Sequence, residues 1–216
     1  MKRALILDLD NTIYPVSSIA DNLFEQLFTL LDQHSGDINY DDLLKAKDEM
    51  TRRPYHLVAD KYNFSAALKN KGTSLLQNIT YDAPMQTYDE YSFIRDLPID
   101  RFLVTTGFTK LQQSKVKMLG IEGDLKEFHI VDPETSSLTK RDVFADIIKR
   151  HHYKTQDVLV VGDDPESEIK AAIDLGIDTF LFDPDDKHSD AVVTYKARNL
   201  KEIVDFLAGE KLKGES

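Results

Sequence analysis

Asp8 and Asp10 stand two residues apart, directly after the unbroken apolar run of residues 4–7. Such a run is typical of a strand buried on both faces of a parallel sheet, and the Asn11 and Thr12 behind it favour a turn. Ligands of open α/β sheets bind just beyond the carboxyl ends of the strands. Two carboxylates at that place repel each other, so they need a cation or a shared proton.

The same spacing has two less specific interpretations. An ordinary polar turn after a strand also brings two acidic residues together. A calcium loop starting at Asp8 is a second alternative, but Ile13 replaces the glycine of its sixth position and Ile19 replaces the glutamate of its twelfth. The pair alone therefore does not decide between a turn and a functional site.

Polar or charged residues also follow the next apolar runs of the chain. The run at 101–104 leads into hydroxyl side chains, the run at 127–131 leads to a helix-borne lysine, and the run at 157–161 ends in glycine and acid. These residues are Thr105, Thr106 and Gly107, then Lys140, then Asp163 and Asp164. Because the carboxyl ends of parallel strands meet at one edge of a sheet, we expect carboxylates, hydroxyls and an ammonium to converge there.

The elements that must position these residues alternate between strand and helix from residue 97 onward. This alternation predicts a Rossmann-like, doubly wound parallel sheet with right-handed crossovers, and with a last short strand at 191–194. Residues 15–96 instead repeat apolar side chains at helical spacing, with breaks near Asn63 and at Gly72. The sequence thus predicts an α/β core domain of residues 1–14 and 97–216, with residues 15–96 inserted as a small α-helical cap domain.

The composition limits the compartment and the partners. The 216 residues carry a net charge of -11 and contain no cysteine, which excludes disulfides and thiolate catalysis and argues against nucleic acid polymers or an anionic membrane as partner. An anionic substrate would need local positive charge from a metal ion and a lysine. Without a membrane-length apolar run or a signal-peptide h-region, we expect a cytoplasmic protein, either a monomer or a homodimer.

Four ordered motifs give the chain a resemblance to a known family. The chain resembles the phosphatase branch of the haloacid dehalogenase (HAD) superfamily, with a helical cap inserted after the first motif. The motifs are D-x-D-x-T at residues 8–12, an apolar strand ending in Thr105, the helix-borne Lys140, and G-D with further acid at residues 162–164. The match covers essentially the whole chain.

The resemblance implies Mg²⁺-dependent hydrolysis of phosphate monoesters through an aspartyl-phosphate. Asp8 would be the nucleophile, and Asp10 would protonate the leaving alkoxide and then take a proton from the attacking water. The Mg²⁺ ligands would be the Asp8 carboxylate, the Asp10 backbone carbonyl and Asp163. Stabilisation of the phosphoryl oxygens would fall to Thr105, Thr106, Gly107 and Lys140.

Three positions depart from the common family pattern. Thr106 stands where asparagine is frequent, and Arg141 follows Lys140 where proline is usual. Glu168 occupies the place of the usual second acidic aspartate, so either Glu168, reaching the metal through water, or Asp164 would complete the metal site. These differences bear on metal affinity more than on the type of reaction.

The inserted helices are expected to close over the site and to select the leaving group. Among capped members, residues 10–14 look most like pyrimidine 5'-nucleotidase relatives, and phosphoglycolate phosphatase-like members are also similar. We therefore expect a small phosphorylated metabolite as substrate, with a nucleoside monophosphate favoured. Tyr14, Arg52 and Arg53 are candidate substrate contacts, although a solvated helix end also explains the two arginines.

Other activities on the same fold remain open at this stage. A dehalogenase needs no acid two residues after its nucleophile, so Asp10 argues against that reaction. A phosphomutase keeps all four motifs but returns an isomer instead of free phosphate. A non-catalytic binding or regulatory protein is the third alternative, against which the intact carboxylates and Lys140 argue.

Overall fold

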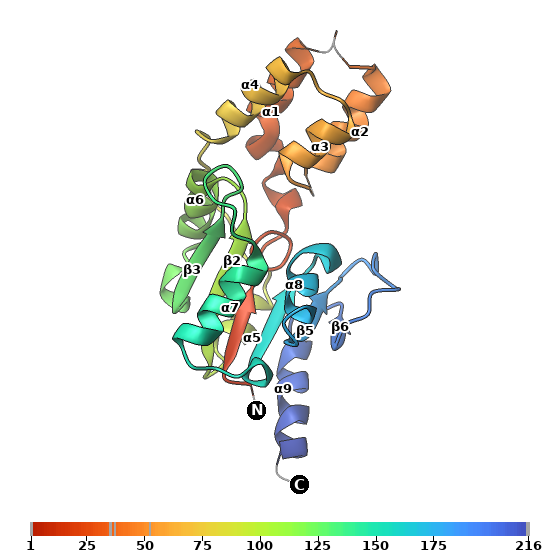
Figure 1. Cartoon of the computed structure of the whole chain (residues 1–216). Helices are drawn as coiled ribbons and strands as arrows, with labels where there is room; N and C mark the ends of the chain where they lie inside the picture. Colours follow the sequence, from red (N-terminus) through yellow and green to blue (C-terminus); the bar gives the residue numbers. More distant parts are fainter. Residues whose placement is uncertain (1, 35, 37, 52, 215–216) are drawn as a thin grey trace. The chain divides into compact units, whose positions relative to one another are not determined.

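The computed structural model describes residues 2–34, 36, 38–51 and 53–214 (Figure 1). These residues form two units. One, which we call the sheet unit, comprises Met1–Pro15, Gln86–Thr106 and Leu119–Ser216. The other, the helical unit, comprises Val16–Met85 and Gly107–Met118.

Six parallel strands make one sheet in the described part of the sheet unit, in the order β3-β2-β1-β4-β5-β6. The strands are β1 (Ala4–Leu7), β2 (Asp100–Thr106), β3 (Glu127–Val131), β4 (Val158–Gly162), β5 (Asp178–Phe182) and β6 (Tyr195–Ala197). β1 pairs with β2 on one side and with β4 on the other. The strand order therefore reverses between β1 and β4, which is the point where open α/β sheets bind their ligands.

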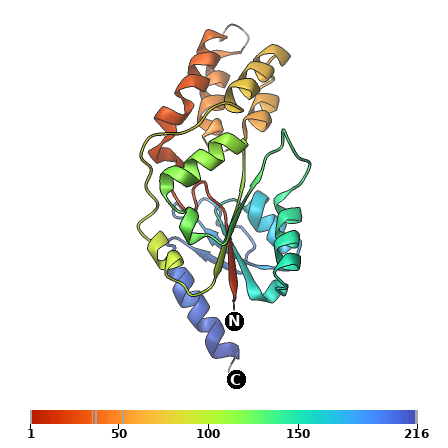
Figure 2. The ribbon, with the colours of Figure 1, turned by 90° about the vertical axis from the view of Figure 1, so that its left-hand side faces the viewer.

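Helices cover both faces of this sheet (Figure 2). α7 (Lys140–Arg150) and the short α8 (Lys170–Ile173) lie on one face, and α5 (Tyr91–Arg95) and α9 (Glu202–Gly214) lie on the other. Because both faces are covered, the central strands are apolar at every position instead of at every second one. The core between the sheet and α7 includes Ala4, Ile6, Phe102, Val104, Phe144, Ile147, Val158 and Val160.

The helical unit buries one apolar stripe from each of its main helices. α1 packs on α4, and α3 packs on both α2 and α4. The helices are α1 (Ala20–Gln33), α2 (Tyr40–Met50), α3 (Tyr55–Lys61), α4 (Ala66–Leu76) and α6 (Thr109–Leu119). The buried stripe of α1 consists of Leu23, Leu27 and Leu31, at the four-residue spacing that aligns side chains on one helix face.

The units begin and end at other residues than the sequence predicts. Residues 86–96 lie in the sheet unit, where the Tyr91 hydroxyl donates to Asp124 at 3.3 Å and Asn199 donates to Glu90 at 2.9 Å. Residues 107–118 lie in the helical unit, where the Tyr81 amide donates to the Ser114 hydroxyl at 2.8 Å. Such hydrogen bonds between segments far apart in the chain leave no periodicity in the sequence.

Two local predictions are wrong. α4 continues through Gly72 instead of breaking there, because a Cβ on Gly72 would lie 2.1 Å from the Tyr55 hydroxyl and only glycine leaves room for that ring. The last strand is β6 at Tyr195–Ala197 and not residues 191–194. Instead, the Thr179 amide donates to the Thr194 hydroxyl at 3.1 Å, and the Thr194 amide donates to the Thr179 hydroxyl at 3.0 Å. The ladder starts one residue later.

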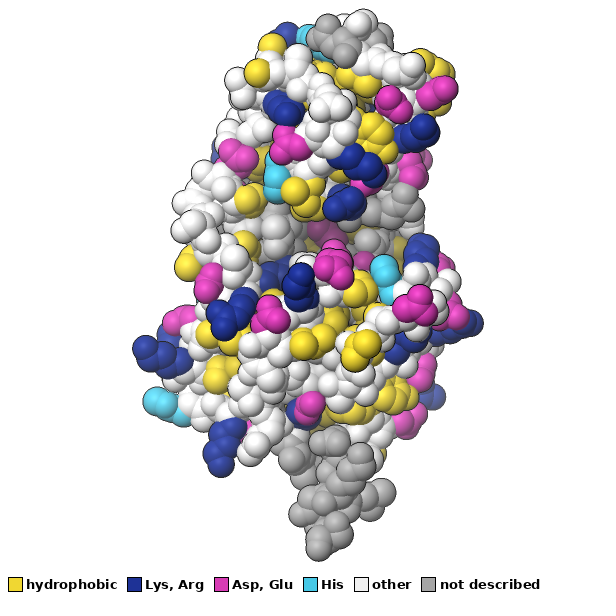
Figure 3. All heavy atoms as spheres, turned by 45° about the vertical axis from the view of Figure 1, so that its right-hand side comes forward, with side chains coloured by type: hydrophobic (Ala, Val, Ile, Leu, Met, Phe, Trp, Pro, Cys, Tyr) yellow, Lys and Arg dark blue, Asp and Glu magenta, His cyan; other side chains and the backbone are white. Residues whose placement is uncertain are grey.

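The surface is charged and mixed in sign. Figure 3 shows acidic and basic side chains interspersed with small apolar areas on the face that it presents. The most exposed large apolar side chains are Tyr40, Leu138 and Val192, which are scattered along the chain. No helix within the described ranges is both long enough and apolar enough to span a membrane.

Candidate active site

Asp8 follows the central strand β1, and the loop behind it makes a tight turn. The Asp8 amide continues the sheet by donating to the Val161 carbonyl at 2.9 Å. Asn11 then takes the left-handed conformation with φ of 56°, which asparagine tolerates better than most residues. The Ile13 amide donates back to the Leu9 carbonyl at 2.9 Å. The turn thus keeps both aspartates at the carboxyl end of the sheet.

Lys140 is the first residue of α7, and its position is set by a capping box. Thr139 accepts a hydrogen bond from the Asp142 amide, and the Asp142 carboxylate accepts one from the Thr139 amide. A cation at a helix N-terminus is unfavourable with respect to the helix dipole. Lys140 nevertheless stays buried there, because its ammonium donates to Asp8 at 2.6 Å and to Glu168 at 2.7 Å.

Asp163 and Glu168 come from the segment after β4, the strand next to β1. Asp163 follows the strand directly, and Glu168 lies in η5 (Pro165–Ile169), a single π-helical turn with non-helical dihedral angles at Ser167. π-turns of this kind are frequent at functional sites. The wider turn brings the Glu168 carboxylate inward, where it accepts the Asp164 amide at 2.8 Å.

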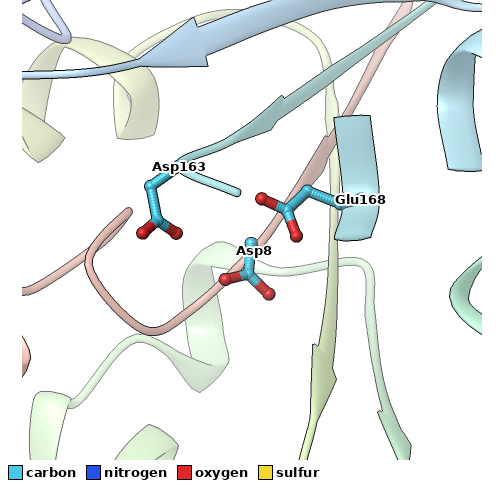
Figure 4. A group of neighbouring side chains, drawn as sticks. All are labelled: Asp8, Asp163 and Glu168. Atoms are coloured by element: carbon cyan, nitrogen blue, oxygen red, sulfur yellow. The ribbon is translucent and has the colours of Figure 1, made fainter. Parts of the chain in front are cut away.

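The carboxylates of Asp8, Asp163 and Glu168 meet at the end of the sheet (Figure 4). One oxygen from each lies within 4.8 Å of the others. Burial raises the pKa of Asp8 to about 7, with the Lys140 ammonium lowering it and Glu168 raising it further. Burial, followed by the charges of Glu168 and Asp8, raises the pKa of Asp163 to about 9. Fully ionised, the three carboxylates would carry more negative charge than the Lys140 ammonium compensates, so burial and their mutual repulsion favour the protonated forms of Asp8 and Asp163.

The structure separates the two candidates for the last acidic position. Glu168 is buried beside Asp8, whereas Asp164 is exposed and its side chain accepts the Glu166 amide at 2.8 Å as a helix cap. Glu168 therefore belongs to the carboxylate cluster, and Asp164 supports the turn that carries it.

The threonines of the motifs occupy different places. Thr12 is buried and donates to Asp163 at 3.3 Å, so it links the first motif to the fourth. Thr105 is buried near the end of β2, beside β1, and Thr106 is half-buried at the last position of that strand. Gly107 belongs to the helical unit. The phosphate-binding role of Thr105, Thr106 and Gly107 stays a prediction.

Asp10 and Tyr14 form a pair that the sequence does not predict. The Tyr14 hydroxyl donates to one Asp10 carboxylate oxygen, and an isolated β-bridge joins the backbones of the two residues. The Tyr14 ring is completely buried. Tyr14 thus contacts Asp10, and its role as a substrate contact stays a prediction.

Gly162 is a site residue whose role has no signal in composition or periodicity. A Cβ at this position would lie 2.1 Å from a Glu168 carboxylate oxygen and 2.3 Å from its Cγ. The glycine therefore leaves the space that the Glu168 side chain fills. The G-D pair of the fourth motif is the sequence signal that marks this position.

Tyr88, in the segment that returns to the sheet unit, is a second residue that sequence reasoning missed. Its amide donates to the Ile13 carbonyl at 2.9 Å, and its ring lies edge-on to Phe182 with centroids 5.2 Å apart. Burial raises the pKa of Tyr88 to about 12, and the negative charge of Asp163 adds to the shift. Tyr88 thus borders the carboxylate end of the sheet.

Arg53, a candidate substrate contact in the helical unit, has its ion-pair partner within that unit. Arg53 forms an ion pair with Glu49 at 2.7 Å on the surface of that unit. Arg52 lies outside the described residues. Tyr55, the first residue of α3, is buried and donates to the Leu68 carbonyl at 3.0 Å. The solvated helix end is the interpretation that the contact of Arg53 supports.

The donor set of the cluster suits a hard divalent cation. All three groups present carboxylate oxygens, which Mg²⁺ and Ca²⁺ prefer, and no cysteine is present in the chain. A bound cation would lower the raised pKa values of Asp8 and Asp163 by supplying the positive charge that burial makes necessary. The arrangement also has a buried ammonium beside the same carboxylates, so it can hold an anion next to Asp8.

Solved structures share this architecture over nearly their whole length. A haloacid dehalogenase-like hydrolase from Streptococcus pneumoniae is 17% identical with a TM-score of 0.73, covering 95% of this chain and 98% of its own. A HAD-hydrolase from Bacillus subtilis bound to magnesium is 20% identical, with a TM-score of 0.67 and coverage of 95% and 98%. A HAD phosphatase from Thermococcus onnurineus is 18% identical, with a TM-score of 0.66 and coverage of 97% and 99%. Two 2-haloacid dehalogenases, from Pseudomonas syringae and Xanthobacter autotrophicus, match as well.

Sequence comparison adds the family to the fold. A search of curated proteins finds no match to the chain. A family model described as haloacid dehalogenase-like hydrolase matches residues 2–176, which contain all four motifs and the carboxylate cluster. The chain belongs to the haloacid dehalogenase-like hydrolases.

Proposed function

We propose that this hydrolase cleaves phosphate monoesters with Mg²⁺ as cofactor, through an aspartyl-phosphate on Asp8. The observation that carries the proposal is the cluster of Asp8, Asp163 and Glu168, whose oxygens lie within 4.8 Å of one another. Displacement of a halide from carbon requires one carboxylate nucleophile and no cation site. Transfer of a phosphoryl group requires positive charge around the phosphate oxygens, which a divalent ion and Lys140 supply together.

In the first half-reaction, one Asp8 carboxylate oxygen attacks the phosphorus atom. The bond between phosphorus and the ester oxygen breaks, and the leaving alkoxide takes a proton from the Asp10 carboxyl group. Lys140, which donates to Asp8 at 2.6 Å, orients the nucleophile and contributes charge beside the phosphoryl oxygens. Thr105, at the end of the neighbouring strand, is proposed to donate to one of those oxygens.

In the second half-reaction, water attacks the phosphorus of the aspartyl-phosphate. The ionised Asp10 accepts a proton from that water, the bond between phosphorus and the Asp8 oxygen breaks, and inorganic phosphate leaves with Asp8 regenerated. Asp10 is thereby returned to its protonated form for the next turnover. The same residue serves both halves, because its carboxylate lies two residues from the nucleophile on the same turn.

The Asp8 and Asp163 carboxylates and the Asp10 backbone carbonyl would hold the Mg²⁺, with Glu168 supporting the site through Lys140 or through water. When bound, this ion neutralises the cluster and polarises the phosphate. Thr12 keeps the Asp163 carboxylate in place by donating to it at 3.3 Å.

The substrate is proposed to be a small phosphorylated metabolite, and a nucleoside monophosphate is our first choice among such compounds. The support is the similarity of residues 10–14 to pyrimidine 5'-nucleotidase relatives. The net charge of -11 is a general obstacle to polyanionic polymers and anionic membranes, which favours a small ester that reaches the cation site.

Phosphate release from purified protein tests the proposal. An aryl phosphate, a set of nucleoside monophosphates, sugar phosphates and phosphoglycolate are each assayed with Mg²⁺ and with excess chelator. We expect phosphate release that depends on the divalent ion. Halide release from a 2-haloacid without metal would instead assign the dehalogenase reaction, and conversion of a sugar phosphate to its isomer, dependent on a bisphosphate, would assign a phosphomutase.

A further inference from the structure

The Asp10 carboxyl group is held by a residue of its own loop. The Tyr14 hydroxyl donates to Oδ1 of Asp10 from a ring that is buried on all sides, with 0% of the residue exposed. A buried phenol keeps its hydroxyl hydrogen-bonded, because an unpaired donor in a protein interior costs free energy. The contact therefore restrains the rotation of the Asp10 side chain.

The backbone around this pair is restrained as well. An isolated β-bridge joins Asp10 to Tyr14, and the left-handed Asn11 and the hydrogen bond from the Ile13 amide to the Leu9 carbonyl close the turn between them. The Tyr88 amide adds a hydrogen bond to the Ile13 carbonyl at 2.9 Å. A turn tied at so many points holds the hydroxyl of Tyr14 at a constant place relative to Asp10.

We propose that Tyr14 is a positioning residue that fixes the carboxyl group of Asp10 for proton transfer to the leaving group. The inference rests on the proposed phosphatase function and deepens it. The phenol donates to Oδ1, and the proton that passes to the leaving alkoxide comes from the Asp10 carboxyl group. Tyr14 keeps its own proton through both half-reactions, and the atoms balance as in the scheme above.

The proposal predicts an effect that depends on the leaving group. An alkoxide needs its proton when the ester bond breaks, whereas a nitrophenolate leaves as a stable anion. General acid catalysis contributes about 10²- to 10⁴-fold where a proton must be transferred. Misplacing the acid therefore affects an alkyl phosphate much more than an activated aryl phosphate. The parameter to compare is kcat/KM, because it reports the steps up to the release of the alcohol and excludes hydrolysis of the aspartyl-phosphate.

The test uses Tyr14→Phe, which removes only the hydroxyl and keeps the buried ring. Tyr153→Phe is the matched control, because the Tyr153 hydroxyl also donates to a carboxylate, that of Asp100, at the opposite end of the sheet. Each variant is assayed with Mg²⁺ on glycerol phosphate and on 4-nitrophenyl phosphate. For Tyr14→Phe we expect kcat/KM to fall by about 10- to 100-fold on the alkyl ester and by less than about threefold on the aryl ester.

The outcomes separate this inference from the proposed function. Equal losses on both esters, or no loss on either, would overturn the positioning role of Tyr14 while leaving the phosphatase assignment standing. The same selective loss in Tyr153→Phe would also overturn it, because the effect would then not be specific to Asp10. If the unmodified protein hydrolyses neither ester, the comparison is made with the nucleoside monophosphate or sugar phosphate that it hydrolyses best. If it hydrolyses none of the phosphate esters assayed above, the proposed function is wrong, and the proposed role of Tyr14 is wrong with it.

Discussion

The two ends of the parallel sheet differ in the charges that surround their carboxylates. At the amino end, Glu127 begins β3 and receives two hydrogen bonds from Arg150, at 2.7 and 3.0 Å, and has the His151 ring nitrogen at 2.6 Å. Arg150 above all, with His151 and His129, lowers the pKa of Glu127 to about 2. The carboxylates of this end are thus matched by cations and hydrogen-bond donors.

At the carboxyl end, carboxylates outnumber the neighbouring cations, and the pKa shifts have the opposite sign. Asp8, Asp163 and Glu168 share one neighbouring ammonium, that of Lys140, and burial raises the pKa values of Asp8 and Asp163 to about 7 and about 9. Burial disfavours the Lys140 ammonium, but Asp8 and Glu168 outweigh it and raise the pKa of Lys140 above its usual value. Among the described residues of this cluster, three carboxylates thus share one ammonium.

Under the proposed function, the amino end contributes to stability and the carboxyl end carries the chemistry. Pairs that lower a carboxylate pKa stabilise the folded state, whereas clustered buried carboxylates destabilise it and are retained at sites that bind cations. Substitutions that neutralise a carboxylate should accordingly change the stability of the metal-free protein in opposite directions at the two ends. The predictions below use that contrast, starting with the largest effect.

Asp8→Asn should abolish phosphate release, with a loss of about 10⁴-fold or more, because an amide oxygen cannot form the aspartyl-phosphate. The measurement is phosphate release from an aryl ester with saturating Mg²⁺. Asp100→Asn is the control at the other end, where the carboxylate accepts from Lys126 at 2.7 Å and takes no part in the site. If Asp8→Asn retained activity, Asp8 would not be the nucleophile. The chemistry proposed for this end of the sheet would then be wrong.

Gly162→Ala should weaken the response to Mg²⁺ by about 10- to 100-fold, the usual effect of disturbing groups that support metal ligands. The added Cβ would lie 2.1 Å from a Glu168 oxygen, so Glu168 and its partner Lys140 must shift. A titration of activity against Mg²⁺ concentration measures the change. Gly123→Ala, where nothing lies within 4 Å of the new Cβ, should leave the titration unchanged. An unaltered midpoint in Gly162→Ala would show that Glu168 does not influence the cation.

Gly162 also illustrates what the sequence could predict and what it could not. The strands, the Lys140-bearing helix and the order of the motifs are local patterns, and the structure places Asp8, Lys140 and Asp163 together as those patterns predict. The space reserved at Gly162 is a contact with a side chain six residues later, folded back by a π-turn. Such a turn leaves no periodic signal, so the choice between Glu168 and Asp164 could not be made from residue types.

The unit boundaries and Tyr14 escaped prediction for a similar reason. Apolar periodicity identifies a helix at residues 109–119 but not the unit against which its buried side packs. Tyr14 appeared as a substrate contact because its type and its place after the motif fit that role equally well. Its burial and its bond to Asp10 depend on how the turn closes in space.

Asp163→Asn and Glu127→Gln should change stability in opposite directions when the metal is removed by a chelator. Because the pKa of Asp163 is raised to about 9 in the folded protein, folding at neutral pH must protonate this carboxylate. Asp163→Asn removes that cost and should raise the unfolding temperature by a few degrees, about 2–4 °C for each kcal/mol. Glu127→Gln removes the charged partner that Arg150 has besides Asp146 and should lower that temperature by a similar amount. Thermal unfolding with chelator gives both values, and Mg²⁺ should remove the advantage of Asp163→Asn. Two shifts of the same sign would contradict the contrast between the ends.

The smallest predicted effect is the acid sensitivity of the amino end. Because the pKa of Glu127 falls from 4.5 to about 2 on folding, its contribution is fully present above about pH 4.5 and is lost as the pH falls toward 2. The shift alone corresponds to an upper limit of about 3 kcal/mol, and solvent screening of a carboxylate with 26% of its side chain exposed reduces this to about 1 kcal/mol.

Urea unfolding between pH 2 and 6 should therefore show the stability of Glu127→Gln converging with that of the unmodified protein as the pH falls. Glu134→Gln, at an exposed loop position, is the control, and its free energy of unfolding should differ from that of the unmodified protein by the same amount at every pH. If the difference in free energy of unfolding between Glu127→Gln and the unmodified protein stayed constant down to pH 2, Glu127 would stabilise the sheet by packing and not by its charge. The contrast in charge between the two ends would then not explain its contribution.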